Sequence, residues 1–213
     1  MKSEKLAEKI NTNIAKWAKD KDKLVVAIDG YTGIGKTTIL DHLEKINPDI
    51  LAVHQDDFGL SRKKVKALLK NTYDRSVVFE LRNRDLKKIA RLVKLFRSGR
   101  NKSYSIKTYN YKTGKIDSVK KFDLSKHIFV IEGIFMFHPK LLNHLWDKRI
   151  YLEGNTKIID KRRIKREKRK WGKDYFPETH PDSYFRQVII ALKRYERKYK
   201  PKLVADLVLK VNN

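Results

Sequence analysis

A glycine-rich turn between an apolar run and a helical pattern is the feature that most restricts how this chain can fold. Residues 24–28 (LVVAI) form a continuous apolar run of strand length, which is typical of a strand buried on both faces of a parallel sheet. Residues 30–37 (GYTGIGKT) fit the pattern G-x-x-x-x-G-K-[ST]. Residues 36–46 then carry apolar side chains at helical spacing. The chain therefore predicts a strand, a tight turn and a helix in direct succession.

The residue types in this turn are those that bind phosphate groups. Glycines let the main chain curve closely around an anion, so that N–H groups and the positive end of the next helix point toward it. Lys36 adds a charge for the outer phosphates, and Thr37 offers its hydroxyl to Mg²⁺. We therefore expect a nucleoside triphosphate with Mg²⁺ on Gly30, Tyr31, Thr32, Gly33, Ile34, Gly35, Lys36, Thr37 and Thr38. The loop alone does not separate kinases from ATPases, GTPases or translocases.

Strand-length apolar runs alternate with helical patterns along the rest of the chain. Further strands are predicted at residues 50–53, 128–131, 149–152 and 204–211, and helices at residues 85–97, 156–170 and 184–199. Strands separated by helices predict an α/β fold around a parallel sheet. We expect a single domain over residues 1–213, with an N-terminal helix in residues 1–20, a hairpin excursion at about 103–124 and a lid at about 156–180.

The net charge raises the question of a polyanionic partner. The chain carries 51 lysines and arginines against 25 acidic residues, which gives a formal charge of +26. Clustered cations bind phosphates of nucleic acids, whereas a generally cationic and solvated surface is the alternative. Because the basic residues are spread along the chain as well as clustered, nucleic acid is an open but not a favoured partner.

Other features of the composition exclude several classes of protein. The chain has no cysteine, which excludes a disulfide scaffold, a thiol nucleophile and a zinc site with cysteine ligands. No apolar stretch approaches the ~20 residues of a membrane span, and the N-terminal residues lack the apolar core of a secretory signal. We therefore expect a cytoplasmic protein with no membrane partner, and the sequence does not indicate its oligomeric state.

Acidic residues follow two of the predicted strands. Asp56 and Asp57 come after the strand at residues 50–53, and Glu132 ends the strand at residues 128–131. Ligands of open α/β sheets bind beyond the carboxyl ends of the strands. Transfer of a phosphoryl group to an alcohol needs an acceptor for the hydroxyl proton and a carboxylate for Mg²⁺, and these acids supply both. A turn or cap role is the alternative, and we expect it for one of Asp56 and Asp57.

The order of these motifs resembles that of a known group of kinases. The segments IDGYTGIGKTT, HQDDF, YNYKTG, VIEGIFMF and KRRIKRE occur in the order found in the uridine kinase, phosphoribulokinase and nicotinamide riboside kinase group of P-loop kinases. The resemblance covers about residues 20–210. It implies a P-loop NTPase three-layer α/β sandwich with a five-stranded parallel sheet and a small, mobile, basic lid, and an activity on small molecules that uses ATP and Mg²⁺.

The resemblance also implies roles for single residues. It assigns the general base to Asp56 and a metal-associated carboxylate to Glu132, with Asp57 beside the acceptor. Asp85 falls near the position where relatives bind ribose hydroxyls, although Glu80 or Asp74 is an alternative, and a helix-terminal role for Asp85 is equally compatible with its position. Tyr109 matches an aromatic residue that contacts the nucleobase in uridine kinases, with hairpin packing as the alternative.

The chain departs from uridine kinases around this tyrosine. Relatives that phosphorylate uridine tend to carry a proline before the tyrosine, an aspartate after it and a histidine five residues beyond it. Here those places hold Lys107, Asn110 and Gly114. The departures put uridine itself in doubt and leave the nucleotide half of the prediction unchanged.

The predicted lid is strongly basic. Residues 157–173 contain ten lysines and arginines and two acids. The resemblance places Arg162, Arg163 and Arg166 over the nucleotide, with Arg162 and Arg166 acting on the transferring phosphoryl group and Arg163 binding the nucleotide. An exposed cationic helix is the alternative. A second basic cluster at residues 193–202 includes Tyr195 and Tyr199, for which we favour core packing over base stacking.

The leading hypothesis is a small-molecule kinase that moves the γ-phosphoryl group of ATP to a hydroxyl of a nucleoside-like acceptor. A kinase that acts on a nucleic-acid 5′-hydroxyl and a nucleic-acid-binding P-loop ATPase are the alternatives, and the positive charge favours both.

Overall fold

The main structural element is a five-stranded parallel sheet with the strand order β2-β5-β1-β6-β7. The computed structural model describes residues 3–172, 175–180 and 183–211. The strands are β1 (Leu24–Gly30), β2 (Ile50–His54), β5 (Ile128–Glu132), β6 (Lys148–Gly154) and β7 (Leu207–Val211). All neighbouring pairs in this sheet run parallel. The predicted α/β fold with a five-stranded parallel sheet is confirmed.

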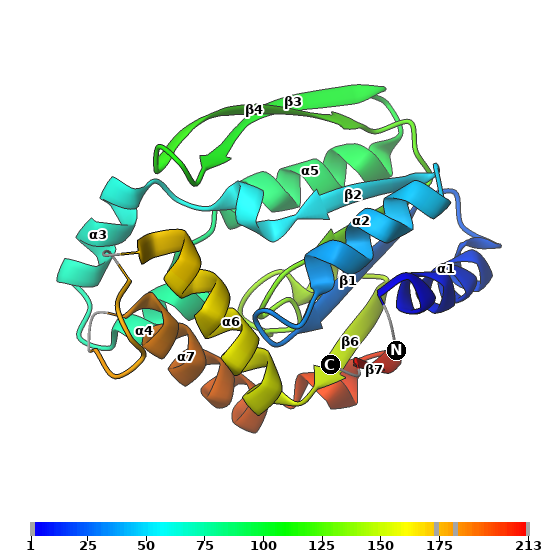
Figure 1. The fold of residues 1–213 in the computed structure, drawn as a ribbon. Coiled ribbons are helices and arrows are strands. Elements are labelled where there is room, and N and C mark those ends of the chain that lie inside the picture. Colours follow the sequence, from blue (N-terminus) through cyan, green and yellow to red (C-terminus); the bar gives the residue numbers. More distant parts are fainter. Residues whose placement is uncertain (1–2, 173–174, 181–182, 212–213) are drawn as a thin grey trace.

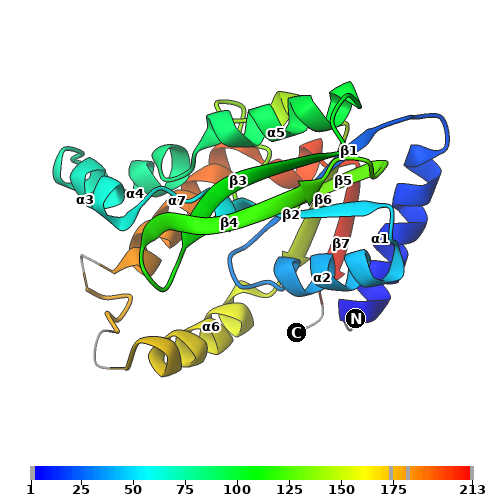
Figure 2. The ribbon, with the colours of Figure 1, turned by 90° about the horizontal axis from the view of Figure 1, so that it is seen from above.

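Helices cover both faces of the sheet and make a three-layer arrangement (Figures 1 and 2). Helices α1 (Ser3–Ala18) and α2 (Lys36–Ile46) pack together on one face, and α5 (Leu86–Ser98) and α7 (Tyr184–Tyr199) lie on the other. Shorter elements complete the chain: η1 (Gln55–Phe58), α3 (Arg62–Lys70), α4 (Arg75–Val77), the π-helix η2 (Val78–Arg82), η3 (Asn143–Leu145) and η5 (Pro201–Val204). Among the described residues, no helix is both long enough and apolar enough to cross a membrane.

The continuous apolar runs in the sequence reflect the central position of their strands. Every residue of β1 and of β5 is buried, because helices cover both faces of these strands. From β1 the chain winds toward one side for β2 and β5 and toward the other for β6 and β7. A crevice for ligands is expected where the winding direction changes, at the carboxyl end of β1.

A hairpin stands apart from the main sheet. Strands β3 (Ser103–Asn110) and β4 (Lys115–Asp123) pair antiparallel and run along the edge formed by β2, at the top of Figure 1. Its inner side packs through Phe122, whose ring stacks on Phe58 with centroids 6.3 Å apart. The hairpin therefore covers the end of the segment that follows β2.

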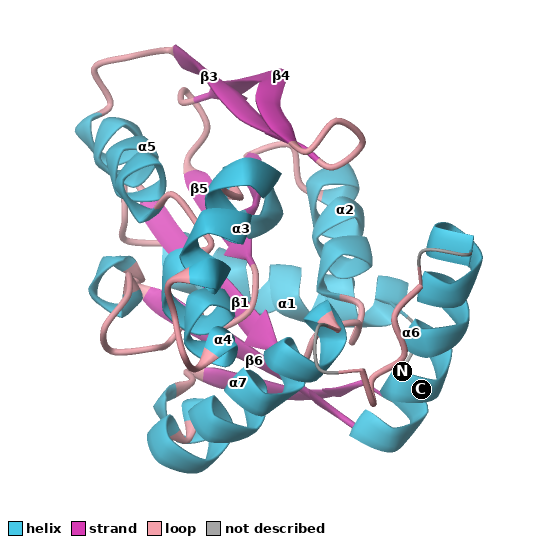
Figure 3. Ribbon diagram, turned by 90° about the vertical axis from the view of Figure 1, so that its left-hand side faces the viewer, coloured by secondary structure: helices cyan, strands magenta, loops and turns pink. Residues whose placement is uncertain are grey.

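The helix α6 (Thr156–Trp171) carries the predicted lid and stands beside the sheet rather than flat on it (Figure 3). Asn155 caps its first turn by accepting hydrogen bonds from the main-chain N–H groups of Lys157 and Ile158. Ile159 and Arg163 are its buried anchors, whereas Lys165, Lys168 and Arg169 are exposed. Lys173, also expected in this lid, lies outside the described residues.

Two local features differ from the sequence pattern. Ile46, the last apolar residue of the helical pattern at residues 36–46, is 46% exposed at the end of α2. The last strand begins at Leu207 instead of Val204, because residues 201–204 form the 3-10 helix η5 with Pro201 in its first turn. Proline disfavours a strand and suits the start of a helix.

Candidate active site

The glycine-rich loop joins β1 to α2 and opens toward solvent at the first turn of that helix. Gly35 precedes α2 with a backbone φ of +110°, a conformation that residues with a side chain rarely adopt. No side chain caps the start of the helix. Gly30 is equally restricted, because a Cβ atom there would lie 2.7 Å from the carbonyl oxygen of Leu152. The uncapped N–H groups and the helix dipole therefore remain available to an anion.

Lys36 is held inside the curve of this loop. Its Nζ donates hydrogen bonds to the carbonyl oxygens of Gly30 (2.9 Å) and Tyr31 (3.1 Å). Burial lowers the pKa of Lys36, which Glu132 and Asp29 partly oppose. A cation in such surroundings gains much from an anionic ligand, as expected for a lysine that binds phosphates.

A buried acid that sequence reasoning missed supports the base of the loop. Asp29 accepts hydrogen bonds from the Gly30 N–H (2.7 Å) and from the hydroxyl of Tyr195 (2.6 Å). Burial raises the pKa of Asp29, and these hydrogen bonds oppose the increase. Tyr195 is 1% exposed and also accepts from the N–H of Phe137. The core role that we favoured for Tyr195 is confirmed.

The lid helix contacts the loop directly. The hydroxyl of Tyr31 donates to Asp160 of α6 (3.1 Å), and the aliphatic part of Arg163 lies against Gly33. Arg163 is 2% exposed, with its guanidinium over the ring of Phe185 and 3.3 Å from Asp160. None of its three side-chain nitrogens has a hydrogen-bond partner among the described residues. The charge of Arg163 is thus paired with Asp160, but its N–H groups remain available as hydrogen-bond donors to an anionic ligand at the loop.

Thr37 and Glu132 come together as expected for a Mg²⁺ site. The Thr37 hydroxyl donates to Glu132 Oε1 (3.0 Å), and His54 Nδ1 lies 3.1 Å from the same oxygen. The hydrogen bond to Glu132 raises the pKa of His54, although burial opposes it. The part of the chain that the structure describes holds no group of three or more His, Asp or Glu side chains that could bind a metal alone. A hydroxyl and one carboxylate fit an ion that takes its other ligands from phosphates and water.

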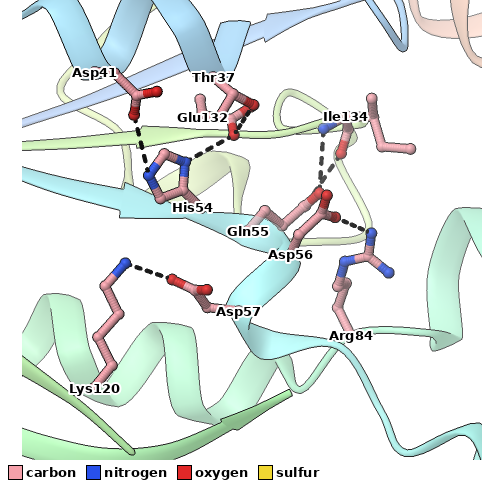
Figure 4. Close-up of polar contacts among 10 residues, drawn as sticks. All are labelled: Thr37, Asp41, His54, Gln55, Asp56, Asp57, Arg84, Lys120, Glu132 and Ile134. Carbon is pink, nitrogen blue, oxygen red and sulfur yellow. Dashed lines mark hydrogen bonds and ion pairs between the residues drawn. The ribbon is translucent and has the colours of Figure 1, made fainter. Parts of the chain in front are cut away.

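The two adjacent aspartates after β2 point in different directions (Figure 4). Asp57 pairs with Lys120 of the hairpin (2.7 Å), whereas Asp56 lies toward Arg84, whose Nη2 donates to Asp56 Oδ1 (2.6 Å). Gln55, directly after β2, forms hydrogen bonds with both the main-chain N–H and the carbonyl of Ile134, two residues after β5. This pair of bonds fixes the position of the Asp56 segment relative to Glu132.

Two cavities of similar size meet at Asp56. The first, of about 550 Å³, is lined by the loop residues 32–38, Glu132 and the lid residues Arg162, Arg163 and Arg166; we call it the donor cavity because a phosphoryl donor would bind at the loop. The second, of about 580 Å³, is lined by Asp57, Phe79, Asn83, Tyr109 and Tyr111 among others; we call it the acceptor cavity because it would hold the group that receives the phosphoryl. Asp56, Arg84 and Tyr184 line both cavities. A group held in one cavity can therefore meet a group held in the other at the carboxylate of Asp56.

Most of the predicted site residues line these cavities, and three do not: Gly30, Tyr31 and Asp85. The side chain of Tyr31 lines a separate cavity of about 390 Å³, behind the loop. Asp85 lines neither the donor nor the acceptor cavity; its carboxylate caps α5 by accepting from the Lys88 N–H (3.1 Å), which is the alternative role. Of the two other acids weighed for that place, Glu80 is buried and Asp74 caps α4, and both bind Arg194.

Sequence reasoning missed Arg84 and Asn83, which both line the acceptor cavity. Asn83 is 6% exposed, and its main-chain carbonyl accepts from the Leu60 N–H (3.1 Å). No motif marks either residue, because their role depends on pairing between two segments that are 25 residues apart. An arginine directly before a helix-capping residue, as Arg84 is before Asp85, is too common in sequences to indicate a site.

Comparison with known proteins supports the fold and identifies a family. Residues 25–195 match the model of the Phosphoribulokinase / Uridine kinase family. A chloroplastic uridine/cytidine kinase of Arabidopsis thaliana is 27% identical over 156 residues, which is 70% of this chain but 31% of the plant protein. This chain therefore spans about a third of the length of that relative.

Solved structures of kinases share the fold at low sequence identity. A possible uridine kinase from Bacillus stearothermophilus superposes with a TM-score of 0.66 at 18% identity, covering 93% of this chain and 96% of the other. D-glycerate 3-kinase from Cryptococcus neoformans gives a TM-score of 0.71 at 14% identity, covering 97% and 95% of the two chains. The predicted P-loop kinase fold is confirmed, and these structures differ in the acceptor named for each.

Proposed function

Because the chain belongs to the Phosphoribulokinase / Uridine kinase family, we propose that it transfers the γ-phosphoryl group of ATP to a hydroxyl group of a nucleoside-like small molecule. The observation that carries this proposal is the meeting of two cavities at one exposed carboxylate, Asp56. A hydrolase needs a single cavity for nucleotide and water, whereas a kinase needs a second cavity for the alcohol.

On the donor side, the proposal assigns the triphosphate to the main chain of residues 32–38, to Lys36 and to Arg163. Thr37 and Glu132 would hold Mg²⁺, which would supply positive charge to offset that of the phosphates. Arg162 and Arg166 line the same cavity from the exposed side of α6 and would neutralise charge on the transferring group.

At the junction, Asp56 would accept the proton of the attacking hydroxyl. Its side chain is 85% exposed and so is accessible from both cavities. Asp57 has the structural role of holding the hairpin through Lys120, and it contributes to the wall of the acceptor cavity. Between the two aspartates, this contrast supports Asp56 as the base.

The acceptor cavity favours an aromatic or sugar-like molecule. Phe79, Tyr109, Tyr111 and Tyr184 supply ring faces and edges, and Asn83 and Arg84 supply polar groups at its inner end. Aromatic rings stack on a nucleobase or cover the apolar face of a ribose. Lys107, Asn110 and Gly114 stand where uridine kinases carry other residues, so this proposal does not commit to uridine.

A second candidate, a kinase for nucleic-acid 5′-hydroxyl groups, is favoured by one observation. Helix α3 starts at Arg62, which lines the acceptor cavity, and it carries five cations and no acid in nine residues. A basic helix at the mouth of the cavity suits further phosphates on the acceptor.

The test is ADP production from Mg·ATP with single acceptors: uridine, cytidine, adenosine, nicotinamide riboside, pantothenate, glycerate and a 5′-hydroxyl oligonucleotide. We expect turnover with at least one nucleoside and none with the Lys36→Ala variant. Turnover only with the oligonucleotide, with a steep dependence on salt, would support the second candidate instead. ATP hydrolysis that no acceptor accelerates would overturn both.

A further inference from the structure

Arg84 stands at the junction of the donor and acceptor cavities, and none of the sequence motifs includes it. Its Nη2 donates to Asp56 Oδ1 at 2.6 Å (Figure 4), and the two side chains differ sharply in exposure: 14% for Arg84 and 85% for Asp56. Among the described residues no group bonds to the second carboxylate oxygen of Asp56, Oδ2. The arginine therefore holds one oxygen of the carboxylate and leaves the other open to the cavities.

The main chain fixes Arg84 independently of this ion pair. Residues 58–60, which follow the two aspartates, run antiparallel to residues 83–85. The Leu60 N–H donates to the Asn83 carbonyl (3.1 Å), and the Asp85 N–H donates to the Phe58 carbonyl (2.8 Å). Between these two hydrogen bonds, Gly59 and Arg84 form an isolated antiparallel β-bridge. Both partners of the ion pair are thus attached to one small, hydrogen-bonded unit.

The element that precedes Arg84 is also anchored. Residues 78–82 form a π-helix, a rare conformation that is often found at functional sites. Its Glu80 is buried, bonded to Arg194 of α7 and 3.3 Å from His138. Burial alone would raise the pKa of Glu80, but His138 and Arg194 outweigh burial and lower it. An ionised, fully paired Glu80 keeps the turn before Arg84 in place.

This arrangement differs from an ordinary surface salt bridge, in which two flexible side chains meet in water and contribute little to stability. Burial alone would lower the pKa of Arg84, but the Asp56 carboxylate and the Tyr184 hydroxyl together outweigh burial and raise it. The Nε of Arg84 is buried without a hydrogen-bond partner among the described residues, which costs stability. A buried N–H group without a partner destabilises the folded protein, and such groups are often found where a side chain must be held in one orientation for function.

We propose that Arg84 is the positioning residue of Asp56: it binds Oδ1 so that Oδ2 is presented to the acceptor hydroxyl. The proposal rests on the proposed function. In the step, the hydroxyl proton moves to Oδ2 while the alcohol oxygen forms a bond to the γ-phosphorus. The bond from that phosphorus to the β–γ bridging oxygen breaks, and its electron pair leaves with ADP.

The test compares Arg84→Ala and Arg84→Lys with the matched control Arg82→Ala, an exposed arginine of the adjacent π-helix. Rates are measured as ADP production with Mg·ATP and, separately, uridine, cytidine and nicotinamide riboside. We expect Arg84→Ala to lower kcat about 10²-fold, the effect of a misplaced reacting group, with the KM for ATP within about 2-fold of wild type. Added guanidinium ion should restore a substantial part of kcat in Arg84→Ala, and Arg84→Lys should fall between that variant and wild type.

A double-mutant cycle separates positioning from a general structural effect. If Arg84 acts through Asp56, adding Arg84→Ala to Asp56→Asn should change kcat by less than about 2-fold, because the base is already lost. A kcat of Arg84→Ala within about 3-fold of wild type would overturn the proposal. Full additivity in the cycle, or a loss that guanidinium does not rescue while thermal melting stays normal, would also overturn it.

Failure of the proposed function gives a different result. If the wild-type protein transfers phosphate to none of these nucleosides, the kinase proposal fails on its own. The same variants are then compared in the slower hydrolysis of Mg·ATP, in which water replaces the alcohol as the group that Asp56 deprotonates. An unchanged hydrolysis rate in Arg84→Ala would overturn the role of Arg84, and a comparable loss with guanidinium rescue would support it.

Discussion

The donor and acceptor cavities have nearly the same volume, about 550 and 580 Å³, but they are built in different ways. The floor of the donor cavity is one continuous segment, residues 32–39, and its groups for binding anions are main-chain N–H groups, Lys36 and lid arginines. The walls of the acceptor cavity come from separate segments around Asp56, Asn83, Tyr109 and Tyr184. A local motif fixes the first, and tertiary structure fixes the second.

The difference explains why the reaction is easier to infer than the substrate. A loop whose shape depends on a local sequence motif binds the same kind of ligand in many proteins. The shape and polarity of a cavity lined by side chains from distant segments, by contrast, change with single substitutions. We therefore expect substitutions on the donor side to abolish every activity and those on the acceptor side to change selectivity.

The largest expected effect comes from Lys36→Ala. It removes the buried cation of the loop, and we expect ADP production to fall by about 10³-fold or more with every acceptor. Steady-state ADP production measures it, and the exposed Lys45 at the end of α2 gives a matched control, Lys45→Ala. Activity that falls with one acceptor and survives with another would contradict the view that the donor cavity serves all of them.

Next comes Asp56→Asn, which keeps the shape of the side chain and removes its basicity. We expect kcat to fall by at least ~100-fold with little change in the KM for ATP, as for removal of a general base. Asp57→Asn is the matched control and should mainly loosen the hairpin by breaking the pair with Lys120. If Asp57→Asn loses more kcat than Asp56→Asn does, the base is Asp57.

A smaller effect is expected from Arg163→Gln. Loss of a charged hydrogen-bond donor to phosphate costs ~1.5–3 kcal/mol, so the Kd for Mg·ATP should rise about 10- to 160-fold. Isothermal titration measures this change, with the exposed Lys165→Gln on the same helix as the control. Equal Kd values for wild type and Arg163→Gln would remove Arg163 from the donor cavity's function.

The smallest effect belongs to the acceptor side. Tyr109→Ala should raise the KM for a nucleoside acceptor about 2- to 12-fold, the equivalent of ~0.5–1.5 kcal/mol of aromatic contact, and should leave the KM for ATP unchanged. Tyr104→Ala, on the same strand but outside the cavity, is the control. A rise in the KM for ATP alone would mean that the two cavities are not separate in function.

Sequence reasoning was sufficient for the fold and for locating the glycine-rich loop, because both depend on local patterns. Buried strands read as apolar runs, and residues 30–37 carry a motif with a mechanism. Glu132 and Asp56 could be predicted as neighbours because the carboxyl ends of parallel strands meet at one edge of the sheet.

The residues of the acceptor cavity were harder to predict from the sequence, for physical reasons. Arg84 reaches Asp56 through pairing of two loops, a contact that no periodicity reports. Asp85 could serve a ligand or a helix end, and the structure shows the helix cap. The side chain of Tyr31 turned toward Asp160 because the lid packs against the loop, which the motif does not specify.

Ser3 of α1 and Val211 of β7, the first and last described residues, both line the donor cavity. A bulky group attached at either residue, such as an affinity tag, a fluorescent reporter or a surface anchor, would crowd the space proposed for the nucleotide. The turn between α1 and β1, near Lys21, lies at the opposite, amino-terminal edge of the sheet. Attachment at that turn would immobilise the protein while leaving exchange of nucleotide unhindered.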